Sequence, residues 1–228
     1  AKLPARHLNV GFDILSDMVI HPTLDEGEFI KEKAVILEEL KMYKDQPQSH
    51  VHELLDELLW PKHPLGESII GTQESLARMK RDDLVHYQKK YYASQNIIIS
   101  ACGILEHDAL VRRSKLAFLH PGGNQRNTFA AAKDNQDSPQ LKILCKDTEQ
   151  SHLALGFNAF KRDHPLRYAL GLLNIILGGN MSSRLFNEVR EKRGLAYEIG
   201  SQVRRFADTG AFLVHAGMDN QKCGDCLA

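Results

Sequence analysis

The stretch LAYEIGSQVRRFADTGAFLVHA, residues 195–216, decides the fold class of the second half of this chain. Apolar and polar residues alternate over residues 195–203 and again over 211–216, which is typical of strands with one buried face. Asp208, Thr209 and Gly210 between the two segments are turn-forming residues. We therefore expect two strands joined by a short turn.

The residues upstream of this stretch carry further strand and helix patterns. The expected strands are 96–102, 141–145 and 152–160; the first is short, apolar and rich in isoleucine, which predicts a buried strand. The expected helices are 8–20, 24–44, 49–59, 81–92, 106–118, 167–177 and 182–193. Thr23 and Glu26 have the spacing of a capping box, and Gly178 and Gly179 end the sixth helix.

The composition changes between residues 120 and 139, where Gly, Asn, Gln, Asp, Ser and Ala dominate. Such a stretch is typical of a linker. We therefore expect two domains, residues 1–119 and 140–228, joined by residues 120–139.

The overall composition excludes several classes of protein. The chain has 228 residues, of which 43% are hydrophobic and 25% charged, so it can bury a sizeable core. Its 29 basic and 29 acidic residues leave no net charge to attract nucleic acid or an anionic membrane. No apolar run is long enough to span a bilayer, and residues 1–9 do not have the pattern of a signal peptide. Four cysteines are too few for a disulfide-stapled scaffold.

Two glutamates on the second expected helix form an unusual pair. Glu32 and Glu39 are seven residues apart, so they lie about 20° from each other on one helix face, between Val35 and Ile36. Carboxylates between apolar neighbours are costly unless a positive charge meets them. A zinc ion is one solution, because a carboxylate is a good third ligand beside two histidines. A solvated helix edge with nearby lysines is the other, and spacing alone favours it.

The histidines and the cysteine pair give weaker signals. None of the 11 histidines lies in H-E-x-x-H or H-x-x-E-H. His50 and His52 point about 200° apart on a helix, so they would not chelate one ion, and we expect surface histidines. Cys223 and Cys226 form a single C-x-x-C without the second pair that a zinc site needs. We interpret them as ordinary positions at the start of a helix.

Arg190 and Tyr197 also allow two interpretations. Both could reach a cleft and hold a substrate carbonyl or a developing oxyanion. Alternatively, Arg190 complements the dipole at a helix end and Tyr197 is a common strand aromatic. Composition alone favours the second interpretation.

Several longer stretches together carry a resemblance to a known family. They are KAVILEELKMYKDQP at 33–47, HPLGESIIG at 63–71, YYASQNIIISACG at 91–103, EQSHLALGF at 149–157 and LGGNMSSRLFNEVREKRGLAYEIGS at 177–201. In this order they resemble the M16 zinc metallopeptidases, which include insulinase, pitrilysin and the mitochondrial processing peptidase. The resemblance covers most of residues 7–219.

The resemblance implies an α+β fold of two similar two-layer domains, each an antiparallel sheet packed with helices and each incomplete in this chain. It assigns Glu39 as the third zinc ligand and Glu32 as a carboxylate that supports the site. It also places Arg190 and Tyr197 against the backbone of a bound substrate. These four assignments come from the resemblance and reverse the interpretation that spacing alone favours.

The family's other two zinc ligands and its general base lie in an H-x-x-E-H motif that this chain lacks. We therefore expect an inactive internal fragment of a zinc metalloendopeptidase that acts on peptides or unfolded segments. The alternative is a non-catalytic M16-like subunit that binds substrate or has a structural role. We expect no nucleic-acid partner and no membrane span, and a homodimer or heterodimer with another M16-like chain is open. A cytoplasmic location is slightly favoured over the periplasm or the mitochondrial matrix.

Overall fold

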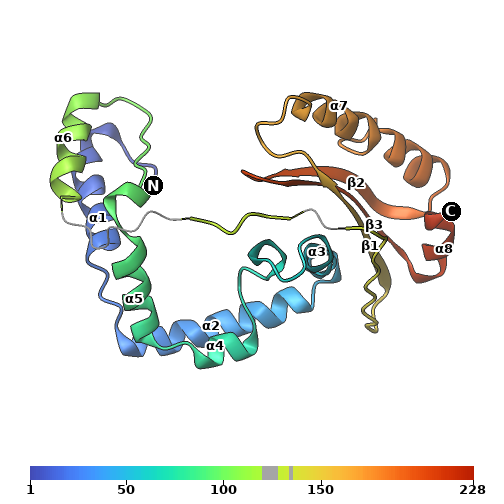
Figure 1. The fold of residues 1–228 in the computed structure, drawn as a ribbon, viewed down its shortest axis with the longest axis horizontal. Helices are drawn as coiled ribbons and strands as arrows, with labels where there is room; N and C mark the ends of the chain where they lie inside the picture. Colours follow the sequence, from blue (N-terminus) through green and yellow to red (C-terminus); the bar gives the residue numbers. More distant parts are fainter. Residues whose placement is uncertain (120–127, 134–135) are drawn as a thin grey trace. The chain divides into compact units, whose positions relative to one another are not determined.

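The structure, a computed structural model, describes residues 1–119, 128–133 and 136–228 (Figure 1). The chain forms two compact units. The first, here called the helical unit, comprises residues 1–36 and 74–129; the second, here called the sheet unit, comprises residues 37–73 and 130–228. The expected linker, 120–139, lies partly outside the described residues. The expected division into domains at 1–119 and 140–228 therefore stays a prediction.

The helical unit is built from helices that the sequence pattern largely predicts. Its elements are η1 (Ala5–His7), α1 (Leu8–Ile20), the first part of α2 (Glu26–Lys44), α4 (Gln73–Arg78), α5 (Arg81–Tyr91), η3 (Ser94–Asn96) and α6 (His107–Ala117). Gln88 on α5 donates from Nε2 to the carbonyl oxygens of Val19 and Ile20, each at 3.2 Å. These bonds satisfy carbonyls at the end of α1 that have no partner within the helix.

The N-terminus of α2 corrects one expectation. The backbone N–H of Glu28 donates to Oδ1 of Asp25 at 3.0 Å, so Asp25 caps the helix. The capping box expected at Thr23 and Glu26 was wrong by two residues. Aspartate is as good a cap as threonine, and the local pattern allowed both.

Two expected strands are absent as strands in the described residues. Residues 97–102 have no ladder partner, and Ile98 is 93% exposed. Residues 141–145 also lack a ladder, and Leu141 is 80% exposed. The expectation of a buried strand at 96–102 was wrong, as was that of a strand at 141–145. An apolar extended segment is a strand only when a second segment pairs with it, and the described residues supply no such partner.

The sheet unit contains a three-stranded antiparallel sheet with the order β1-β3-β2. Its strands are β1 (Gln150–Ala159), β2 (Ala196–Arg205) and β3 (Gly210–Asp219), which confirms the strands expected at 152–160, 195–203 and 211–216. The backbone N–H of Phe206 donates to the Thr209 carbonyl at 2.9 Å and closes the turn between β2 and β3. Together with the helices, this sheet confirms the α+β fold class.

One face of this sheet is covered by α3 (Pro47–Leu59). Leu55, Leu59 and Trp60 pack with Ala211 and Leu213 in one apolar cluster. The helix is followed by η2 (Pro64–Gly66) and begins two residues before the expected start, because proline is favoured in the first turn of a helix.

The opposite face is covered by α7 (Arg167–Leu177), η4 (Phe186–Lys192), η5 (Asn220–Lys222) and α8 (Cys223–Leu227). Figure 1 shows α7 running beside β2. Gly178 caps α7, and its carbonyl accepts a hydrogen bond from the Ser201 N–H at 3.0 Å. A Cβ at Gly178 would lie 2.5 Å from that nitrogen, so glycine permits this close approach. Within the described residues, no helix is both long and apolar enough to cross a bilayer.

Candidate functional site

Arg190 and Tyr197 lie side by side on the sheet unit. Arg190 lies on η4 and Tyr197 on β2, and the guanidinium carbon of Arg190 is 5.9 Å from the centre of the Tyr197 ring. The same carbon is 4.7 Å from the Phe186 ring, so the cation contacts two aromatic faces. Tyr197 is 76% exposed. The structure therefore brings together two candidate residues and leaves the tyrosine accessible to a partner.

The segment between these two residues is held in a defined conformation. η4 is wound as a π-helix, a form that is rare and frequently occurs at functional sites. Gly194 has φ +59°, which favours glycine, and its carbonyl accepts a hydrogen bond from Nζ of Lys222 at 2.8 Å. Val189 and Ala196 belong to one apolar cluster below this segment. Ala196 is buried and Val189 partly buried, whereas Arg190 and Tyr197, which follow them in the sequence, are exposed.

Glu32 and Glu39 both lie on α2, and both are exposed. The lysines expected to accompany them bind elsewhere: Lys31 contacts Glu28, Lys41 contacts Glu38, and Lys33 donates to the carbonyls of Ala77 and Met79. Across the described ranges, no set of three His, Cys, Asp or Glu side chains could hold a metal ion. The structure therefore leaves Glu39 exposed, and among the described residues no complete metal site surrounds it.

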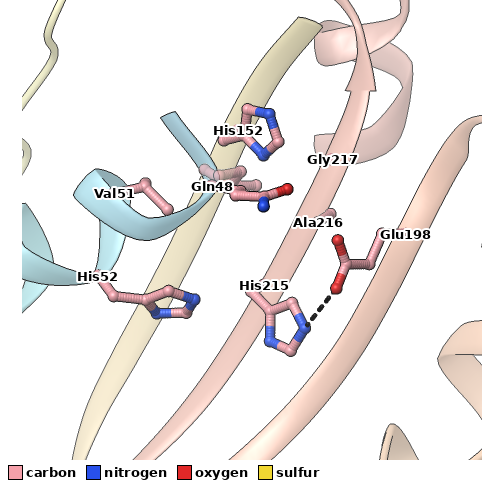
Figure 2. A pocket seen from close by; sticks show the side chains of 9 residues that line it. Gln48, Val51, His52, His152, Glu198, His215, Ala216 and Gly217 are labelled. Carbon is pink, nitrogen blue, oxygen red and sulfur yellow. Dashed lines mark ion pairs between the residues drawn. The ribbon is translucent and has the colours of Figure 1, made fainter. Parts of the chain in front are cut away.

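A cavity of about 270 Å³ in the sheet unit is a feature that the sequence patterns did not predict (Figure 2). His52 enters it from α3, His152 from β1, Glu198 from β2 and His215 from β3. The strand register explains the grouping, because His152 and Glu198 both pair with Gly217 on β3, two residues after His215. A Cβ at Gly217 would lie 3.2 Å from the His152 ring. Glycine there makes room for the imidazoles.

In this cavity, here called the histidine cavity, two of the imidazoles have a buried nitrogen without a hydrogen-bond partner. The rings of His52 and His215 meet edge to face with centroids 5.6 Å apart, and Nδ1 of each is buried without a partner. Nε2 of His215 is 3.8 Å from Oε1 of Glu198. The expectation that His52 is a surface histidine was wrong. Helical periodicity cannot show that β3, which carries His215 163 residues later, covers the face of α3 on which His52 lies.

Burial lowers the pKa of His52 below its ordinary value, and the positive charge of Arg204 lowers it further. His215 acts in the same direction, while Asp56 and Glu198 oppose the shift. Burial also lowers the pKa of His152. Both shifts favour the neutral form of the imidazole.

Two family profiles match this chain. The profile described as "Peptidase M16 inactive domain" matches residues 78–228, and "Insulinase (Peptidase family M16)" matches residues 1–73. This chain belongs to the M16 peptidase family. The M16 profiles thus cover both the helix with Glu39 and the pair Arg190 and Tyr197.

Curated relatives named as zinc proteases are similar along nearly the whole chain. It is 38% identical over 218 residues to "Uncharacterized zinc protease YmxG" of Bacillus subtilis strain 168, covering 95% of this chain and 52% of that protein. It is 33% identical to "Uncharacterized zinc protease SCO5738" of Streptomyces coelicolor, covering 100% of this chain and 51% of the relative. The chain spans about half the length of the curated relatives it matches.

Two solved structures share the fold of this chain. A crystal structure of a peptidase M16 inactive domain from Pseudomonas fluorescens superposes with a TM-score of 0.84 at 25% identity, covering 94% of this chain and 52% of the other. A protease from Helicobacter pylori superposes with a TM-score of 0.86 at 22% identity, covering 94% and 53%. At that identity the second likeness concerns the fold alone.

Proposed function

We propose that this M16 chain is part of a longer zinc-dependent endopeptidase that hydrolyses peptides or unfolded polypeptide segments. In this proposal Arg190 and Tyr197 hold the substrate backbone, Glu39 is one zinc ligand and Glu32 supports it. The observation that carries the proposal is the guanidinium of Arg190 lying 5.9 Å from the centre of an exposed Tyr197 ring. Two donors that share one exposed surface suit an extended peptide with repeated carbonyl acceptors.

The chemistry proposed for this pair is hydrogen bonding to a carbonyl oxygen. The guanidinium presents several N–H donors in a fixed plane, and the phenol presents one O–H donor. Donors aimed at an oxygen that gains negative charge stabilise the transition state more than the ground state. Contact with Phe186 and Tyr197 limits the rotation of Arg190, so fewer conformations are lost when the substrate binds.

Zinc in such an enzyme lowers the pKa of a bound water and so supplies a nucleophile at neutral pH. A catalytic zinc site needs three protein ligands, and Glu39 would provide one of them. The described residues do not complete that set. We therefore derive no catalytic step through zinc for this chain, and the proposal for Glu39 rests on family membership.

The test uses the longer protein with Tyr197→Phe and Arg190→Ala. Tyr197→Phe removes one hydroxyl and should lower kcat about 10²- to 10³-fold, while Arg190→Ala should also raise KM. Zinc content should not change in either variant. The matched control is a second arginine–tyrosine pair of the sheet unit, Arg167 and Tyr168, at 4.3 Å from cation to ring.

Tyr168→Phe and Arg167→Ala should cleave peptide at the rate of the native sequence. If Arg190→Ala and Tyr197→Phe also cleave peptide at the rate of the native sequence, the two residues have no catalytic role. If the native longer protein binds peptide without cleaving it, the alternative of a non-catalytic M16 subunit is correct. Pairing with a second M16-like chain and a cytoplasmic location stay predictions.

A further inference from the structure

The two cysteines of α8 have the spacing of a disulfide pair. Cys223 and Cys226 lie three residues apart in one helix, and both are partly buried. Helical rise and radius place Cα atoms at this spacing about 5 Å apart. That separation falls within the range that disulfides require, roughly 4.4–6.8 Å. By contrast, Cys102 and Cys145 are exposed and lie on segments without regular structure.

The two thiols contact the apolar cluster that supports Arg190 and Tyr197. Both pack against Ala196, Ala216 and Met218, together with Val189. Val189 immediately precedes Arg190, and Ala196 immediately precedes Tyr197.

A polar contact reinforces this connection. Lys222, next to Cys223, donates from Nζ to the carbonyl oxygen of Gly194 at 2.8 Å. Gly194 lies between Arg190 and Tyr197 in the sequence. α8 is therefore tied to the segment that joins the two candidate substrate-binding residues, both through the cluster and through this bond.

We propose that Cys223 and Cys226 are a reversible thiol–disulfide pair whose oxidation changes the conformation of the segment from Arg190 to Tyr197. The oxidant is a low-molecular-weight disulfide. One thiolate attacks a sulfur of that disulfide, a mixed disulfide forms and the first small thiol leaves. The second cysteine then attacks the protein sulfur of the mixed disulfide and releases the second small thiol. Two cysteine thiols are oxidised, one small disulfide is reduced, and the two cysteine protons go to the released thiols.

The surroundings of Cys226 affect its reactivity. Burial raises the pKa of the Cys226 thiol, and the neighbouring Cys223 raises it further. Because the thiolate is the attacking form, this shift slows the first attack by Cys226.

Oxidation draws the two sulfurs to about 2 Å from each other, so at least one must move along the surface of the apolar cluster. The cluster is close-packed, and the shift is transmitted to Val189 and Ala196. The effect on substrate binding rests on the proposed function of Arg190 and Tyr197. Formation of the disulfide does not.

The experiment treats this chain with oxidised glutathione under native conditions, alkylates the remaining thiols and maps the peptides by mass spectrometry. We expect a bond between Cys223 and Cys226, with neither residue carrying glutathione or alkyl groups. Cys102 and Cys145 should carry glutathione, because they have no resolving thiol beside them. In Cys226→Ser, Cys223 should retain glutathione. The double variant Cys102→Ser, Cys145→Ser is the control and should form the bond as the native sequence does.

Hydrogen exchange measured on the same samples tests the conformational part. Amides 193–197 should exchange at a different rate in the oxidised chain, whereas those of α1 should not change. Glutathione retained on Cys223 in the native sequence, or a bond that forms only in urea, would refute the thiol pair. A bond that forms without a change at amides 193–197 would refute the link to Arg190 and Tyr197. Neither readout requires peptidase activity, so failure of the proposed function gives a different result from failure of this inference.

Discussion

The ion pair between Arg204 and Asp56 should help to hold α3 on the sheet, and its removal should lower the free energy of unfolding. Nη1 of Arg204 lies 2.5 Å from Oδ1 and 2.6 Å from Oδ2 of Asp56, and joins β2 to α3 within the sheet unit. Each side chain is 23% exposed. Asp56→Asn keeps the shape of the side chain and removes its charge, so Arg204 would be left partly buried without a counter-ion.

The magnitude follows from distance and burial. At an effective dielectric constant of about 20, charges 2.5 Å apart attract by roughly 6–7 kcal/mol before desolvation. Desolvation of both groups offsets most of this attraction. Exposed pairs contribute about 0–1 kcal/mol, whereas removing one partner of a fully buried pair costs about 3–5 kcal/mol. With about three quarters of each side chain covered, we expect Asp56→Asn to lower the free energy of unfolding by about 2 kcal/mol.

The assay uses the fluorescence of Trp60, which is the one tryptophan in the sequence. Trp60 is 1% exposed, follows the last residue of α3 and meets the Phe206 ring edge to face at 5.4 Å. Its emission therefore reports the separation of α3 from the sheet. Urea unfolding of Asp56→Asn, Arg204→Met and the double variant forms a double-mutant cycle, with an expected coupling of about 1–2 kcal/mol.

The control cycle uses Lys146 and Asp45, an ion pair 2.7 Å apart whose side chains are 39% and 75% exposed. Its expected coupling is much smaller than that of Arg204 and Asp56, because water screens exposed charges. A coupling for Arg204 and Asp56 no larger than in this control would show that the pair does not hold α3, and would refute the reasoning from burial.

Three further predictions concern acid, metal and the α2 glutamates. The folded-state pKa of His52 lies below its ordinary 6.5, so the free energy of unfolding should keep the full contribution of neutral His52 above pH 6.5. It should fall as the pH drops through 6.5 toward the folded-state pKa. Urea midpoints measured at several pH values should depend less on pH in His52→Gln. This chain should cleave no peptide and should retain no stoichiometric zinc after dialysis against a weak chelator. It should also bind hydrophobic dye through exposed residues such as Ile98 and Leu141. Tightly bound zinc that requires Glu39, or a dye-negative monomer with sharp reversible melting, would contradict these expectations. In the longer protein, Glu39→Gln should lose zinc and turnover together, while Glu32→Gln should lose less, about 10- to 100-fold; full zinc content and turnover in Glu39→Gln would exclude it as a ligand.

The sequence by itself determined the local structure of this protein. Helical periodicity predicted α1, α7 and most of α2, and two-residue alternation predicted β1, β2 and β3, because side-chain direction along one element follows from backbone geometry. The resemblance of longer stretches to M16 peptidases was confirmed as family membership. It also selected Arg190 and Tyr197, which spacing alone interpreted as a helix-end cation and a strand aromatic.

Only the tertiary structure decided which segments have partners. The apolar runs at 97–102 and 141–145 look like strands locally, yet they form no ladder and most of their side chains are exposed. Pairing depends on a second segment that no local pattern reveals. The histidine cavity arises in the same way: His52, His152 and His215 are distant in sequence, and strand register together with the packing of α3 brings them together. Periodicity reports which side of an element is apolar, whereas burial, unpaired imidazoles and shifted pKa values depend on what another element places against that side.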